Sequence, residues 1–109
     1  MNFNVLTTRL FERKLKFLAK KYPSIANDLN ELEKTLAENP TLGEPLGKDC
    51  YKIRMAITSK GKGKSSGARI ITYIRVLKNT VYLINIYDKS EQVTISQTEL
   101  KMIINEMVE

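Results

Sequence analysis

The 109-residue sequence contains no histidine and only one cysteine, Cys50. The absence of histidine excludes general-base catalysis by an imidazole and argues against a zinc site, so we expect neither a metal ion nor another cofactor. A single cysteine allows no internal disulfide, which is typical of a reducing compartment. No apolar run reaches the length of a membrane span, and no signal peptide is visible. These absences predict a cytoplasmic protein with no membrane partner.

Positive charge is in excess and is unevenly distributed along the chain. The formal net charge is +6, and nine of the 18 lysine and arginine residues lie between Lys48 and Lys78, where Asp49 is the only acid. A scattered excess of this size would serve solubility alone. A local cluster instead indicates an anionic partner, such as nucleic acid or an acidic protein.

The length predicts one domain over residues 1–109. Apolar spacing and turn residues predict a strand at 2–6, helices at 9–22 and 25–38, a loop at 41–49, strands at 51–59, 68–76 and 81–87, and a helix that begins after Ser96. This β-α-α-β-β-β-α order predicts an α+β domain, in which an N-terminal helix hairpin packs on one face of a small antiparallel sheet. The strand at 81–87 is the most apolar, and we expect it in the centre of the sheet.

The most basic stretch is the predicted hairpin, whose tip reads K-G-K-G-K-S-S-G and carries Lys60, Lys62 and Lys64. Because nothing apolar would hold this tip in place, we expect it to be mobile and to contact the nucleic-acid backbone. The tip shares G-K-S with a phosphate-binding P-loop. However, Thr58 occupies the position of the first P-loop glycine, and a strand follows instead of a helix, which argues against nucleotide hydrolysis.

Alternation on the two hairpin strands places further cations on the sheet face opposite the helix pair. The residues expected on this face are Lys52, Arg54, Arg69, Tyr73 and Lys89. Like charges on neighbouring strands repel, so folding gains nothing from them. Arginine can hold phosphate oxygens through bidentate hydrogen bonds. The pattern therefore indicates a phosphate site, with side chains that simply face solvent as the alternative.

The strings Y-K-I-R-M-A-I-T-S-K-G-K-G-K-S-S-G-A-R-I-I-T-Y and V-Y-L-I-N-I-Y-D-K-S-E, with K-Y-P-S-I, N-P and L-G upstream, resemble toxins of the RelE/ParE superfamily from bacterial toxin–antitoxin pairs. The resemblance covers nearly the whole chain. It implies a compact toxin fold and a cognate antitoxin, encoded by an adjacent gene. The RelE branch further implies a metal-independent endoribonuclease, or mRNA interferase, that inhibits translation by cleaving messenger RNA on the ribosome.

The resemblance also implies functional positions. Basic residues of the hairpin strands and just after the last strand correspond to catalytic positions of the family: Lys52, Arg54, Arg69 and Lys89. Many members place a tyrosine further on, where this sequence has Ile95. The role of that tyrosine falls to Tyr87, to Tyr73 or to no residue. We group Tyr87 with the catalytic residues, and Tyr73 with the tip lysines as RNA-binding residues.

Metal-free RNA cleavage requires a base for the 2′-hydroxyl, a stabiliser of the charge that develops on the phosphate, and an acid for the leaving oxygen. A lysine crowded by other cations can act as the base, and Arg69 can stabilise the charge. Two alternatives share these sequence features: a ParE-like toxin that poisons DNA gyrase, and a non-catalytic RNA-binding module. The cluster of Lys52, Arg54 and Arg69 favours the RelE branch over the gyrase poison.

Overall fold

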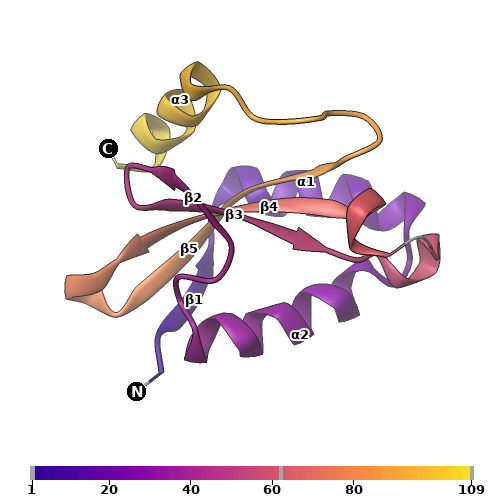
Figure 1. Cartoon of the computed structure of the whole chain (residues 1–109), viewed down its shortest axis with the longest axis horizontal. Helices are drawn as coiled ribbons and strands as arrows, with labels where there is room; N and C mark the ends of the chain where they lie inside the picture. Colours follow the sequence, from indigo (N-terminus) through magenta and orange to yellow (C-terminus); the bar gives the residue numbers. More distant parts are fainter. Residues whose placement is uncertain (1, 62, 109) are drawn as a thin grey trace.

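The computed structural model describes residues 2–61 and 63–108, which form a five-stranded sheet and three α-helices (Figure 1). The strands are β1 (Asn4–Thr7), β2 (Glu44–Gly47), β3 (Cys50–Met55), β4 (Ala68–Arg75) and β5 (Thr80–Asp88). The helices are α1 (Arg9–Lys21), α2 (Ile25–Glu38) and α3 (Gln97–Val108), with short 3₁₀ turns at η1 (Thr58–Lys60), η2 (Lys64–Ser66) and η3 (Val76–Lys78). None of the helices in these ranges has the length and apolar character needed to cross a bilayer.

The sheet has the strand order β1-β5-β4-β3-β2. The predicted α+β class is confirmed, but three details differ. First, β2 lies where we predicted a loop; its Pro45 is tolerated because β2 is an edge strand, and Leu46 is its only apolar residue besides proline. Second, β1 pairs with β5 in parallel, whereas the other pairs are antiparallel. Third, β5 is an interior strand, but β4 occupies the centre.

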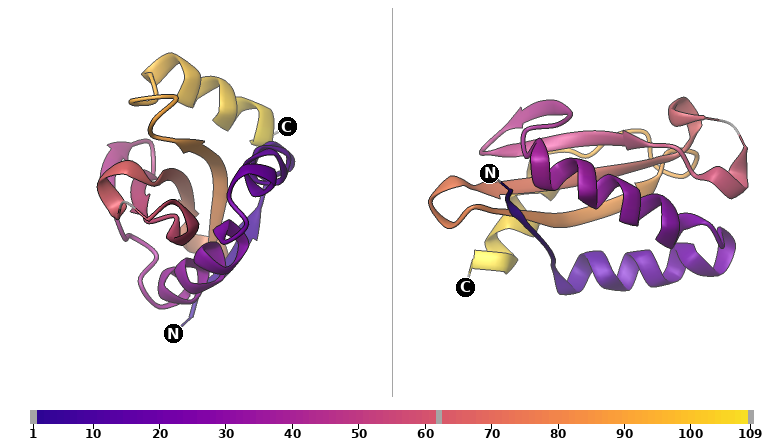
Figure 2. Two further views of the ribbon diagram at one scale, coloured as in Figure 1. Left: turned by 90° about the vertical axis from the view of Figure 1, so that its right-hand side faces the viewer. Right: turned by 90° about the horizontal axis from the view of Figure 1, so that it is seen from below.

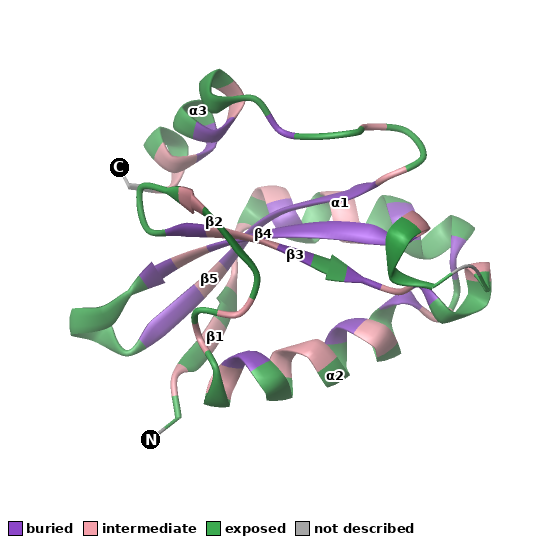
Figure 3. Ribbon diagram, viewed as in Figure 1, coloured by how far each residue is buried: buried purple, intermediate pink, exposed green. Residues whose placement is uncertain are grey.

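Helices cover both faces of the sheet (Figures 1 and 2). On one face, as predicted, the helix hairpin packs on the sheet through Phe11, Leu18, Ile25, Leu29 and Leu36, against Ile53, Ile70, Leu83 and Ile86. On the other face, α3 packs through Leu100 and Ile103, against Cys50, Ile71, Ile84 and Tyr87. The face on which we expected the cations is therefore partly covered by α3. Burial runs along most of β4 and β5, whereas the hairpin tip is largely exposed (Figure 3).

Side-chain oxygens cap two of the three helices. The N–H of Phe11 donates to Thr8 Oγ1 (3.3 Å) at the start of α1, and Ser96 Oγ accepts from the third residue of its helix at 3.0 Å. Ser24, which precedes α2, makes no such capping bond. Its hydroxyl instead donates to Asp28 (2.9 Å) and accepts from the N–H of Ser59 (2.8 Å). The start of α2 is therefore tied to η1, and this tie orients the hairpin tip.

Candidate active site

A row of three side chains crosses the sheet from β3 to β5. The strand register pairs Arg54 with Arg69, and Arg69 with Tyr87. Side chains directly opposite each other on neighbouring strands lie on the same face, so the alternating pattern correctly predicted that Arg54 and Arg69 share a face, but it did not place Tyr87 beside them. Arg54 is exposed, whereas Arg69 and Tyr87 are buried. Burial, followed by the charge of Arg54, lowers the pKa of Arg69.

Arg69 is buried beneath the tip of its own hairpin, with only 3% of its surface exposed. Its terminal nitrogens donate hydrogen bonds to the backbone carbonyl oxygens of Lys64 (2.9 Å), Ala68 (3.2 Å) and Ser65 (3.2 Å). Three of the five N–H donors of the guanidinium therefore face backbone oxygens of the protein itself. The sequence predicted a cation available to phosphate, but the structure shows one that is covered.

Tyr87 contributes a buried hydroxyl to the row. Within the described residues this hydroxyl has no hydrogen-bond partner. Burial raises the pKa of Tyr87, while the charge of Arg69 opposes the shift and that of Glu99 adds to it. A buried hydroxyl without a partner costs folding free energy, about 1–3 kcal/mol. Because this hydroxyl is buried at such a cost next to Arg69, Tyr87 is a candidate for contact with a substrate.

Lys52 is not surrounded only by cations. It lies opposite Glu44 in the register, and its Nζ is 3.6 Å from the Glu44 carboxylate. A carboxylate from β2 therefore lies beside Lys52 in addition to the neighbouring cations, and the role of Lys52 as a base stays a prediction. Lys52, Arg54 and Lys64 line a groove of about 600 Å³ between α2 and β3, and three carboxylates line the same groove: Asp28, Glu31 and Glu44.

The hairpin tip is anchored by polar contacts. Lys60 Nζ donates to the carbonyl oxygen of Ser66 (2.7 Å), to Asp88 Oδ1 (2.9 Å) and to Ser90 Oγ (3.5 Å). The side chain of Lys60 is only 15% exposed. The expectation of a mobile tip considered apolar contacts alone and missed these polar ones, and the prediction of a solvent-facing Lys60 is wrong. Lys64 is exposed, and Lys62 lies outside the described residues.

Asp88, which the sequence analysis did not single out, is the centre of this anchor. Its buried carboxylate accepts hydrogen bonds from the hydroxyl of Tyr22 (2.6 Å), from Lys60, and from the N–H and hydroxyl of Ser90 (2.9 and 2.8 Å). Burial disfavours the ionised carboxylate, but these hydrogen bonds outweigh burial and lower the pKa of Asp88 below its ordinary value. The ionised form of Asp88 therefore stabilises the fold.

This network predicts an acid-sensitive contribution to stability. The pKa of Asp88 lies below the value of 3.8 that is usual for an unfolded chain. The contribution of Asp88 is thus fully present above about pH 5 and is lost as the pH falls through the unfolded-state value toward the folded-state pKa. Asp88→Asn should lower the melting temperature at pH 7 and flatten the fall of the melting temperature between about pH 5 and about pH 3. Glu91→Gln, which removes the exposed Lys21–Glu91 pair, is the matched control and should leave both unchanged. An equally steep acid transition in folded Asp88→Asn would contradict this assignment.

Two predicted site residues lie at different distances from the row. Tyr73 pairs with Cys50 and Tyr82 at the far end of β4, about 13 Å along the strand from Arg69 at the usual rise per residue. Its ring packs against that of Tyr82, with the centroids 6.4 Å apart. The structure does not bring Tyr73 to Arg69. Lys89 lies closer, because its N–H donates to the carbonyl oxygen of Gly67 at the end of the hairpin tip (3.0 Å).

Lys14 of α1 lies near the other end of the row and was not predicted. Its Nζ donates to Asn85 Oδ1 on β5 (2.6 Å), and Lys14 and Tyr87 together line a groove of about 420 Å³ between α1 and β5. Burial lowers the pKa of Lys14, against the opposing charge of Glu99. A half-buried lysine that shares a groove with Tyr87 is a candidate for proton transfer. Lys14 was not predicted because it is one of several cations on α1 and no local pattern distinguishes it from the others.

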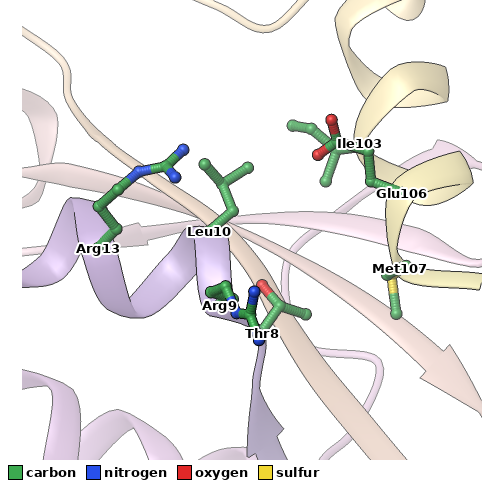
Figure 4. A pocket seen from close by; sticks show the side chains of 7 residues that line it. All are labelled: Thr8, Arg9, Leu10, Arg13, Ile103, Glu106 and Met107. Carbon is green, nitrogen blue, oxygen red and sulfur yellow. The ribbon is translucent and has the colours of Figure 1, made fainter.

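Another groove, of about 440 Å³, separates α1 from α3 (Figure 4). Arg9 and Arg13 project from α1, and Glu106 projects from α3. The apolar residues that line this groove are Leu10, Ile103 and Met107. The two helices thus leave space between them, and α3 covers the sheet without sealing against α1.

No protein-family model matches the sequence. Solved structures do match. A mutant of the E. coli toxin RelE in the free state is 16% identical, with a TM-score of 0.67 over 99% of this chain and 100% of that chain. The toxin–antitoxin complex RelBE of E. coli is 19% identical, with a TM-score of 0.61 over 79% of this chain and 95% of that chain. The isolated E. coli RelE toxin is 17% identical, with a TM-score of 0.61 over 95% and 98%. The chain therefore has the fold of the RelE toxin.

Proposed function

We propose that this chain is the toxin of a toxin–antitoxin pair and inhibits translation by cleaving messenger RNA on the ribosome without a metal ion. The row of Arg54, Arg69 and Tyr87 on a sheet with the RelE fold is the observation that carries the proposal. Two guanidinium groups and a phenol can hold and polarise a phosphate in a chain without histidine. Such a toxin acts in the cytoplasm, where ribosomes translate.

In the proposed reaction the 2′-oxygen of the RNA attacks the adjacent phosphorus and the bond to the 5′-oxygen breaks. The products are a 2′,3′-cyclic phosphate and a 5′-hydroxyl. Arg69, with Arg54 beside it, stabilises the negative charge that develops on the phosphate oxygens. Tyr87 hydrogen-bonds to a phosphate oxygen. Lys14, as the neutral amine, takes the proton of the 2′-hydroxyl and returns it to the leaving 5′-oxygen. The ribosome positions the RNA, so that weak acid and base groups suffice.

The surrounding cations bind the ribosome and its messenger RNA. Lys52 and Lys64 line one groove with Arg54, and Lys89 follows β5 next to the tip. Each contact with a phosphate adds a salt-dependent increment to binding. We do not include Lys60 among these binding residues, because its ammonium group forms an ion pair with Asp88.

Induced expression in bacteria tests the proposal against its main alternative, a gyrase poison. Growth should stop, and messenger RNA should be cut while plasmid supercoiling remains normal. Intact messenger RNA together with lost supercoiling would favour the ParE-like alternative. Normal growth of cells that contain the folded protein would favour a module that binds RNA without cutting it.

The proposed partner is a cognate antitoxin with an acidic and apolar segment. The charge of +6 favours an acidic partner, and the groove between α1 and α3 offers two arginines against one carboxylate, that of Glu106, above an apolar lining. Co-expression with the product of a neighbouring acidic reading frame should yield a complex that survives purification and restores growth. The double variant Arg9→Glu/Arg13→Glu should weaken that complex at least about tenfold, since both charges are reversed. Unchanged affinity would place the antitoxin elsewhere on the surface.

A further inference from the structure

Arg69 cannot reach a phosphate in this conformation, because η2 covers its guanidinium group. We propose that η2 (Lys64–Ser66), called the cap below, is a lid over Arg69, and that the Lys60–Asp88 ion pair, called the latch, holds it closed. Opening of the cap exposes Arg69. This inference rests on the proposed function in one respect: the group that then takes up the guanidinium is a phosphate of RNA.

The cap closes over Arg69 through its own backbone. The carbonyl oxygens of Lys64 and Ser65, at 2.9 and 3.2 Å from the guanidinium nitrogens, occupy the place that phosphate oxygens would take. A neutral carbonyl is a weaker acceptor for a guanidinium than a charged phosphate oxygen, which forms bidentate pairs with arginine. A phosphate can therefore displace the cap, provided that the cap is free to move.

The latch connects the cap to the end of β5. Lys60 donates to Asp88 and also to the carbonyl oxygen of Ser66, the last residue of the cap. The ring of Tyr22 lies 5.6 Å from the Lys60 ammonium group, and the hydroxyl of Tyr22 donates to the same carboxylate. Because the Asp88 side chain is fully buried, the ammonium group cannot leave it without a large loss of electrostatic stabilisation. The latch thus favours the closed cap.

The cap itself is built to move as a small unit. Lys64 and Ser65 are exposed, and Gly63 on one side of the cap lies in open space, whereas Gly67 on the other side is packed against the backbone of Met55 and is the fixed end about which the cap would turn. The neighbouring turn η1 contacts the cap through Lys60, its last residue, and is held on α2 by Thr58, whose N–H donates to Asp28 at 2.9 Å. The cap can therefore swing away from Arg69 while η1 stays on α2 and the core remains intact.

Chemical modification of arginine by phenylglyoxal measures the state of the cap in the free protein. Peptide mass spectrometry gives the modification rates of Arg69 and of exposed Arg54 in the same molecule, so that Arg54 is an internal reference. In the parent protein Arg69 should react at least about tenfold more slowly than Arg54, because only the open fraction reacts. Asp88→Asn should raise the ratio of the two rates at least about tenfold. Glu91→Gln removes the same charge from an exposed pair and should leave the ratio unchanged.

The two modification rates show whether the cap is closed over Arg69 and whether the latch holds it there. Equal rates for Arg69 and Arg54 in the parent protein would overturn the cap, and an unchanged ratio in folded Asp88→Asn would overturn the latch. If Asp88→Asn does not fold, the double variant Asp88→Asn/Lys60→Gln removes both charges together, leaves neither buried and unpaired, and must give the same rise in the ratio. The assay contains no ribosomes. A protein with a slow Arg69 that cuts no messenger RNA would therefore refute the proposed function and leave the cap intact.

Discussion

Arg69→Ala should lower the single-turnover rate of messenger RNA cleavage on ribosomes by about 100-fold or more, the usual loss when one transition-state contact is removed. Arg69 lies between Arg54 and Tyr87 in the row and carries the charge best placed to stabilise the reacting phosphate. Ribosome binding should fall much less, because Arg54, Lys52 and Lys64 remain. Rates at saturating ribosome concentration, together with binding measured separately, distinguish the two effects.

The control for this variant is Arg75→Ala, which removes an exposed arginine from the other end of β4 and should leave the rate unchanged. Arg69→Lys should rescue cleavage only in part, since an ammonium group cannot form the bidentate contact. If Arg69→Ala lost binding and cleavage in equal proportion, Arg69 would be a docking residue. If it lost neither, the row would not be the active site.

Tyr87→Phe should lower the cleavage rate about tenfold or more while it raises the stability of the protein. The hydroxyl of Tyr87 is buried without a partner in the described part of the chain, so its removal relieves an uncompensated desolvation cost. A gain of about 1 kcal/mol would raise the melting temperature by roughly 4–8 °C in a domain of this size. A lower cleavage rate together with a higher melting temperature would show that the Tyr87 hydroxyl serves catalysis and not folding.

Tyr82→Phe is the matched control, because Tyr82 is a half-buried tyrosine on the same strand that packs on Tyr73 away from the row. It should change neither the rate nor the melting temperature by a comparable amount. A lower melting temperature for Tyr87→Phe would mean that the hydroxyl has a stabilising partner. An unchanged cleavage rate would remove Tyr87 from the proposed mechanism.

The sequence was sufficient to predict the two arginines of the row, but not Tyr87, because period-two alternation fixes which residues of a strand share a face. Once the hairpin of β3 and β4 was identified, Arg54 and Arg69 had to lie on one face, and the register places them opposite each other. The helix hairpin followed from apolar residues at helical spacing. Such local periodicities survive in the fold because the core is built from the faces that they define.

Local sequence patterns could not predict contacts between residues that lie far apart in the sequence. The Lys60–Asp88 pair joins positions 28 residues apart, and the Lys14–Asn85 hydrogen bond spans 71 residues. Neither pair leaves a local signal, since a lysine in a glycine-rich tip looks solvated and an aspartate after an apolar strand looks like a turn residue. The cover over Arg69 was missed for the same reason: backbone carbonyls of η2 form it, and every residue type has a carbonyl.

The central claim, that this chain cuts messenger RNA on the ribosome by means of Arg69, is tested most directly with purified components. Ribosomes stalled on an end-labelled messenger RNA are mixed with the parent protein or with Arg69→Ala, and the cut ends are characterised chemically. We predict cleavage by the parent protein only when ribosomes are present, fragments that begin with a 5′-hydroxyl, and a rate that is at least about 100-fold lower for Arg69→Ala. Intact messenger RNA after incubation with the folded parent protein would contradict the account, and inhibition of purified gyrase by the same sample would establish the alternative.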